Sequence, residues 1–201
     1  MELELEPEPE PEPWAVWQDP WAVVAESDRA QWDYVPLERV GPLCFGMRPA
    51  EAAVAMEARG YASDAATEIT RFTRLEQLRT RFRGVGTSPY GADVVAYFVG
   101  SMGLTCVAVD ALSGPQVTFD GIRLVGRPPS ELAAELSACL ERTGRDLEFT
   151  TEGDVGSQEL GMNPRAQRAG DVLLTRLVFG RPNDWARTLY DCVPAEEWRM
   201  R

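Results

Sequence analysis

The strongest hydrophobic pattern in the chain predicts two neighbouring strands. Residues 93–99 and 104–109 are runs of β-branched, aromatic and small apolar side chains, and a Gly-Ser-Met-Gly turn at 100–103 separates them. Two such runs joined by a short glycine-containing turn are typical of a β-hairpin. Further strands are expected at 116–125, interrupted by Asp120-Gly121, and at 171–179.

Two other segments have the pattern of a helix. The first begins at Pro49 and ends before Gly60, in agreement with the preference for proline at the first helical position and glycine just past the end. The second covers residues 130–142 and ends before Gly144. Its predicted apolar face consists of Leu132, Leu136, Cys139 and Leu140.

Two further segments have mixed patterns. Residues 40–46 suit a short strand or a turn. Residues 67–83 mix β-branched, aromatic and Arg side chains and suit one or two strands, although 75–79 would also suit a helix. Hairpins separated by helices predict an α+β fold, in which two or more helices cover an antiparallel sheet.

A spacing of eighty residues relates the two predicted helices and the turns before them. Five pairs match at this offset: Gly41 and Gly121, Gly46 and Gly126, Pro49 and Pro129, Glu51 and Glu131, Ala53 and Ala133. The match predicts a duplicated strand-helix unit. Chance similarity is the alternative, because Gly, Pro and Ala are common in this chain.

The segment 40–51 has the pattern Gly-x-Leu-x-x-Gly-Met-x-x-x-Glu, from Gly41 to Glu51. It resembles the opening of many small bacterial α+β modules, including outer-membrane assembly lipoproteins and uncharacterised actinobacterial proteins that are similar to immunity proteins of polymorphic toxin systems. Because the chain has neither a signal peptide nor a lipidated Cys at its start, outer-membrane assembly is not an expected role. The resemblance implies a binding module rather than an enzyme.

The first 33 residues are expected to form a disordered acidic arm, followed by a single domain at 34–201. Residues 6–13 repeat Glu-Pro four times, which favours an extended polyproline conformation. Trp14, Trp17 and Trp21 follow directly. They are candidate anchors for a groove on a partner protein, and the alternative is that they pack against their own domain.

The negative charge of the chain is concentrated in this arm. Residues 1–38 hold eleven of the 32 acidic residues and one of the twenty basic ones, so the rest of the chain is almost neutral. A neutral body does not favour binding to nucleic acid or to anionic lipid, both of which require a basic surface. With neither a signal sequence nor a long apolar segment, the protein is expected in the cytoplasm.

The residue types that are absent exclude many enzyme classes. The chain has no His, and all twenty basic residues are Arg. Mechanisms that need an imidazole or an amine nucleophile are therefore excluded. The four cysteines are widely spaced and predict buried thiols, with a disulfide pair or a reactive thiol as the alternative; neither a metal site nor a cofactor is expected.

Five arginines lie close together in the sequence: Arg71, Arg74, Arg79, Arg81 and Arg83. If 79–83 is a strand, the last three share a face and form a row of bidentate donors for carboxylates. The ligand would be a partner protein or the chain's own Glu-Pro arm. The alternative is an ordinary charged sheet edge that opposes aggregation.

Taken together, these features predict a cytoplasmic protein-binding module, an immunity or regulatory factor that acts by stoichiometric binding to another protein. The candidate binding residues are the three Trp and five Arg residues named above. The alternative is a carboxylate-dependent or Cys-dependent enzyme, for which Glu152 and Asp154 are a candidate acid pair. The sequence does not predict the oligomeric state.

Overall fold

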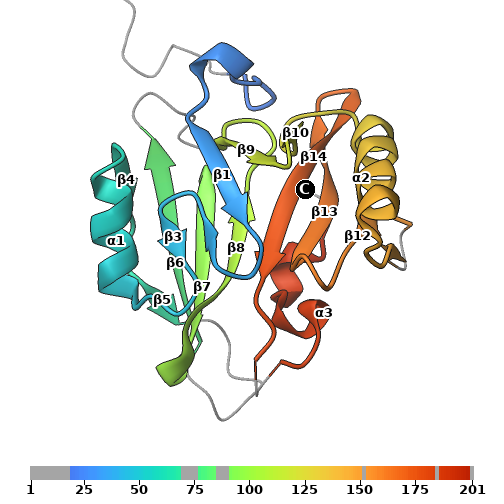
Figure 1. Ribbon diagram of the computed structural model, residues 1–201. Coiled ribbons are helices and arrows are strands. Elements are labelled where there is room, and N and C mark those ends of the chain that lie inside the picture. Colours follow the sequence, from blue (N-terminus) through green and yellow to red (C-terminus); the bar gives the residue numbers. More distant parts are fainter. Residues whose placement is uncertain (1–18, 69–76, 85–90, 151–152, 184–185, 200–201) are drawn as a thin grey trace, which may run out of the picture.

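The computed structural model describes residues 19–68, 77–84, 91–150, 153–183 and 186–199. Within them, the largest element is an antiparallel sheet of seven strands, with β5 paired to β6 beside the main path (Figure 1). Its order is β13 (Met162–Ala169), β14 (Val172–Gly180), β8 (Gly103–Val109), β7 (Val94–Val99), β6 (Gln77–Gly84) and β4 (Tyr61–Ser63), and β5 is Thr67–Glu68. The expected α+β class with a mainly antiparallel sheet is confirmed.

A smaller sheet lies in front of the larger one in Figure 1. Its order is β10 (Ile122–Arg123), β9 (Gln116–Phe119), β1 (Gln31–Val35), β2 (Arg39–Val40) and β3 (Leu43–Cys44). The pairing of β1 with β9 is parallel, and the other pairings in this sheet are antiparallel. A separate short pair is formed by β11 (Glu148–Phe149) and β12 (Val155–Gly156).

The two predicted helices are confirmed as α1 (Pro49–Glu57) and α2 (Pro129–Thr143). The Arg48 N–H donates to the Glu51 carboxylate at 2.7 Å and caps α1. Gly144, in the left-handed conformation at φ +65°, ends α2. The remaining helical turns are short: α3 (Leu189–Cys192), η1 (Glu26–Asp28), η2 (Gly100–Met102) and η3 (Ala195–Glu197).

The main core lies on one face of the larger sheet, which we call the inner face. Phe82, Phe98 and Phe179 from this face pack in the same cluster as the buried side chains of α1, α2 and the smaller sheet. The two helices lie at opposite ends of the larger sheet (Figure 1). On α2, the predicted apolar face is the buried one.

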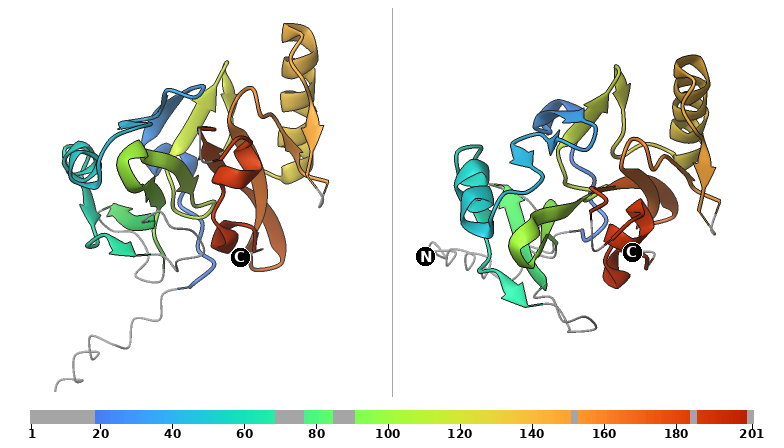
Figure 2. Two further views of the ribbon diagram at one scale, coloured as in Figure 1. Left: turned by 90° about the horizontal axis from the view of Figure 1, so that it is seen from below. Right: turned by 60° about the horizontal axis from the view of Figure 1, so that its bottom comes forward.

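The opposite, outer face of the larger sheet is covered in part by residues 186–199, which we call the C-terminal segment. Figure 2 (left) shows α3 and this segment, in red, on the side of the sheet away from the smaller sheet. A second apolar cluster lies there, with Val95, Tyr97 and Val178 of the sheet packed with Val193 and Trp198.

The folded part of the chain starts earlier than the predicted boundary between residues 33 and 34. That boundary falls inside β1, whose Trp32 and Tyr34 are both buried. Arg29 is also buried: its guanidinium donates to the carbonyls of Val24 (3.1 Å), Ala111, Leu112 and Gly114 (2.8 to 2.9 Å). Apolar burial and this set of hydrogen bonds hold the preceding segment to the domain.

The hairpin at 93–109 is confirmed as β7 and β8. The strand prediction at 116–125 is confirmed as β9 and β10, which turn at Asp120-Gly121 with both φ values positive. Within and just past the segment 67–83, residues 67–68 and 77–84 are strands, so the helical alternative at 75–79 is wrong for its described part. Strand β13 was not predicted.

Candidate binding surface

The three arginines of β6 share the outer face of the larger sheet, as their alternation predicts. Thr80 and Phe82 between them are buried toward the inner face, whereas Arg81 is exposed. We call Arg79, Arg81 and Arg83 the arginine row. Arg71 and Arg74 lie outside the described residues.

The arginines at the two ends of the row are each paired with a carboxylate. Arg79 Nη1 donates to Glu196 Oε2 at 2.6 Å, and Arg83 Nη1 donates to Asp64 Oδ1 at 2.7 Å. Arg83 Nε also donates to the Gly91 carbonyl at 2.7 Å. Among the described residues, the Arg81 side chain has no partner, so the row has an available guanidinium between two occupied ones.

The C-terminal segment crosses the outer face next to this row. Three consecutive residues reach four strands: Glu196 pairs with Arg79 of β6, and Glu197 accepts from Tyr97 of β7 and from Arg176 of β14. On β13, Arg165 Nη2 donates to the Trp198 carbonyl at 2.8 Å, and its guanidinium carbon lies 5.1 Å from the centre of the Trp198 ring. The outer face thus holds an acidic-aromatic peptide, which in this structure belongs to the chain itself.

Glu197 is fully buried at the centre of these contacts, and Arg176 is 1% exposed. Burial, followed by the charge and the hydrogen bond of Glu197, raises the pKa of Tyr97 well above its ordinary value. Tyr97 is therefore a neutral donor to this carboxylate at neutral pH. Three atoms of these guanidinium-carboxylate pairs, Arg79 Nε, Arg176 Nε and Glu196 Oε1, are buried without a hydrogen-bond partner.

Sequence reasoning missed this second half of the surface. Glu196, Glu197 and Trp198 have a local signal, two acids followed by an aromatic residue, but their sheet partners are up to 117 residues away. Of the predicted tryptophan anchors, Trp14 and Trp17 lie outside the described residues. Trp21 is 45% exposed, and its backbone N–H donates to Asp19 Oδ1 at 2.9 Å. Its ring does not stack on a described arginine.

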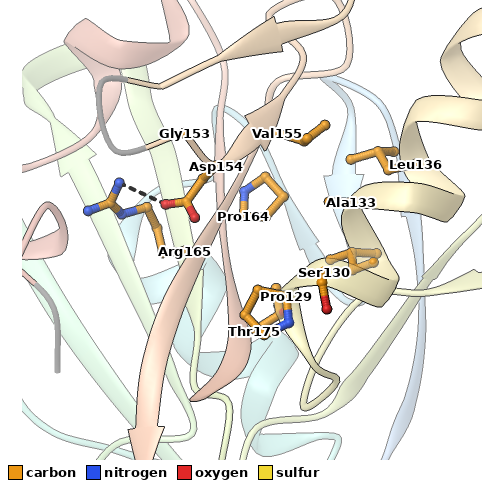
Figure 3. A pocket seen from close by; sticks show the side chains of 11 residues that line it. Pro129, Ser130, Ala133, Leu136, Gly153, Asp154, Val155, Pro164, Arg165 and Thr175 are labelled. Carbon is orange, nitrogen blue, oxygen red and sulfur yellow. Dashed lines mark hydrogen bonds and ion pairs between the residues drawn. The ribbon is translucent and has the colours of Figure 1, made fainter.

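A groove of about 160 Å³ lies between α2 and the strands β12 to β14 (Figure 3). Leu132, Leu136 and Val155 make it largely apolar. Among the described residues that line it, Asp154 is the one carboxylate, and it pairs with Arg165 at 3.2 Å. The other member of the predicted acid pair, Glu152, lies outside the described residues.

The four cysteines are free thiols. Three of them are buried, in agreement with the prediction of buried thiols. Burial raises the pKa of Cys106 and Cys139, and raises that of Cys192 to about 12. These three thiols are protonated at neutral pH and are therefore poor nucleophiles. Within the described ranges, no group of three or more acidic or Cys side chains is placed to hold a metal ion.

No described helix is both long enough and apolar enough to cross a membrane. Comparison of the chain with protein-family models, with curated proteins and with solved structures found no match. Any assignment of function therefore depends on the surface itself.

Proposed function

We propose that the protein is a stoichiometric protein-binding module and that the arginine row is its docking surface. The partner would present a carboxylate-rich segment to the outer face of β6. The observation that carries the proposal is the state of Arg81. This side chain is exposed and has no described partner, while both of its neighbours in the row bind carboxylates.

The C-terminal segment indicates the chemistry of such a partner. Glu196 already fills one position of the row, and Trp198 adds an aromatic contact on the same face. Exposed ion pairs contribute only about 0.2 to 1 kcal/mol each, so pairing with Arg81 alone gives weak binding. A tight partner would therefore combine acidic residues with an aromatic anchor, the residue type that dominates binding energy at interfaces.

An immunity or regulatory factor is the role that this mode of action supports, in the cytoplasm and without a catalytic step. The enzyme alternative needs converging acids or an activated thiol. In the part of the chain that the structure describes, the groove beside α2 supplies one carboxylate, which is paired, and the three buried thiols have raised pKa values. These observations favour the binding module.

The test is affinity capture with the full chain as bait, in lysate of the organism that encodes it. We expect the wild type to capture one protein at a 1:1 ratio. Arg81→Glu should lose this protein. Arg59→Glu, which makes the same change at an exposed arginine in the turn after α1, should retain it. A protein captured equally by both variants would refute the docking surface.

The fold also supports the proposed duplication. Gly41 and Gly121 occupy the turns of β2–β3 and β9–β10 with positive φ, and Gly46 and Gly126 have positive φ before a helix that starts with proline. Descent of both halves from one unit would explain why two helices cover opposite ends of a single sheet.

A further inference from the structure

We propose that the open edge of β13 binds an extended segment of a partner protein as an added strand, with α2 as the opposite wall of the binding groove. Three strands separate β13 from β6, which carries the arginine row, so this surface is distinct from the docking surface proposed above. Three observations carry the inference: backbone groups of β13 without partners, an apolar groove beside them, and an exposed arginine at the end of the edge.

The open side of β13 is paired only at its first residue among those described. There, Met162 exchanges two backbone hydrogen bonds with Ser157, at 3.0 and 3.1 Å. Because successive residues of a strand direct their backbone groups to opposite sides, the same side carries the N–H and C=O of Ala166 and Arg168 and the C=O of Pro164. None of these groups has a partner in the described part of the chain. An extended segment that binds here therefore continues the sheet.

The groove beside α2 lies directly along this edge. Continued antiparallel pairing beyond Ser157 would place Val155 opposite Pro164, but β12 pairs with β11 instead. The groove of about 160 Å³ opens between these two residues and the Ala133 and Leu136 side chains of α2 (Figure 3). An apolar cavity of about 150 Å³ is large enough to bind benzene. One aliphatic side chain of an added strand therefore fits the groove.

Arg168 indicates the charge that the partner segment carries. Alternate side chains share one face of a strand, so Arg168 lies on the same face of β13 as Pro164 and α2. Its side chain is exposed, donates to the Gly170 carbonyl at 3.2 Å, and forms no ion pair with a described residue. Opposite charges on directly paired residues of neighbouring strands stabilise a sheet. The partner residue opposite Arg168 is therefore acidic.

An antiparallel register fixes the order of the partner's side chains. This edge already pairs in the antiparallel sense at Met162, and antiparallel pairing is the more stable arrangement per residue. The partner then runs from the position opposite Arg168 to the position opposite Pro164. Its first, third and fifth residues face α2 and are acidic, small and aliphatic in turn. The first and third each exchange two backbone hydrogen bonds with β13, and the fifth only donates one, because proline has no N–H.

The experiment titrates the capped peptide Ser-Glu-Thr-Ala-Thr-Leu-Ser into the isotope-labelled full chain and follows backbone amides by NMR. We expect a dissociation constant below about 1 mM, with the largest amide shifts at Ala166 and Arg168. N-methylation of the peptide's alanine removes the donor to the Ala166 carbonyl and should weaken binding at least about tenfold. N-methylation of the second threonine, whose N–H points away from β13, should change the affinity less than about threefold.

Matched variants of the protein test the groove and the charge. Ala133→Leu fills the groove and should weaken binding at least about tenfold, whereas Ala134→Leu makes the same change at the exposed neighbouring position and should bind as the wild type does. Arg168→Glu should weaken binding of this peptide and strengthen binding of a peptide with Arg in place of Glu. Circular dichroism verifies that each variant is folded.

Several results would overturn the added strand. No binding at about 5 mM peptide would do so, as would equal affinities of the two N-methylated peptides or unchanged binding to Ala133→Leu. If sedimentation shows a dimer that excludes the peptide, a second copy of the chain occupies the edge and the proposal fails. The arginine row takes no part in these measurements, so such results would leave the docking surface on β6 intact.

Discussion

Glu197 and Arg176 form an ion pair that is shut off from solvent between the C-terminal segment and the larger sheet. Tyr97 donates to the same carboxylate. Removing two charges from water is costly, and the pair is stable only because each partner compensates the other. This pair therefore holds the C-terminal segment on the outer face, and the loss of either partner would remove the compensation for the other.

Removing one partner of this pair should be severely destabilising. We expect Glu197→Gln or Arg176→Met to lower the free energy of unfolding by about 3 to 5 kcal/mol, because the remaining charged group stays buried without its counter-charge. The double variant Arg176→Met with Glu197→Leu should recover much of the loss. Urea unfolding followed by circular dichroism measures all three, with Arg142→Ala, which breaks an exposed pair with Asp120, as the control. Losses of 1 kcal/mol or less in both single variants would contradict the argument.

The buried guanidinium of Arg29 should be another large contributor to stability. Burial lowers its pKa, and the nearby Asp110 charge acts in the opposite sense. Arg29→Ala removes the donors of the carbonyls at 111 and 114 and one of the two donors of the carbonyl at 112, and we expect a loss of about 3 kcal/mol. Arg123→Ala, which removes an exposed pair with Glu26, should cost less than about 1 kcal/mol. Similar midpoints for both variants in thermal unfolding would refute this role.

Asn163 is a position at which an apolar substitution should preserve or raise stability. It lies on β13 opposite Val178, is fully buried, and has no hydrogen-bond partner for either end of its amide. Because an unsatisfied buried amide is costly, Asn163→Leu should be neutral or raise stability by about 1 kcal/mol. Asn163→Asp should lower stability, since it adds an uncompensated charge. A clear loss of thermal stability in Asn163→Leu would mean that the amide has a role which the apolar side chain cannot fill.

Stability should fall in alkali. Burial raises the pKa of Tyr61 to about 12 and that of Tyr97 further, from an unfolded value near 10. At high pH the folded state thus binds more protons than the unfolded state, so the contribution of these groups is complete below pH 10 and is lost as the pH rises toward their folded values. Burial also raises the pKa of Cys192, from about 9 to about 12, so the loss of stability begins at about pH 9.

Urea unfolding between pH 7 and 11 tests this dependence. Tyr97→Phe should lose about 1 to 3 kcal/mol at pH 7, because Glu197 loses a donor, and should show a shallower decline above pH 10. Tyr61→Phe should have a smaller effect at pH 7, since the Tyr61 hydroxyl has no described hydrogen bond. An equally steep alkaline decline in Tyr97→Phe would contradict the assignment.

The elements that were predicted are those whose local sequence agrees with their packing. Strands β7 and β8 are apolar because both faces of their sheet are covered, and α2 has an apolar stripe and a terminal glycine. Strand β13 was missed because it contains Asn163, Arg165 and Gln167, which are buried under other parts of the chain. Its polar pattern predicts an exposed segment unless the partners are known.

The candidate surface was predicted in the same partial way. Their alternation in the sequence was enough to place Arg79, Arg81 and Arg83 on one face, because alternate side chains of a strand point to the same side. The contact of Glu196 with Arg79 joins residues more than a hundred positions apart, and no local pattern encodes such a pairing. The early start of the domain was missed for a related reason, because β1 is completed by β9, a parallel strand from a distant part of the sequence.

The place of the C-terminal segment in the chain has a consequence during synthesis. Residues 186–199 leave the ribosome after every strand that they cover, so the apolar cluster around Val95 and Val178 and the Arg176 guanidinium remain exposed on the nascent chain until then. Translation thus produces an intermediate with a nearly complete sheet and an open hydrophobic face, the type of species that chaperones bind and that aggregates at high expression.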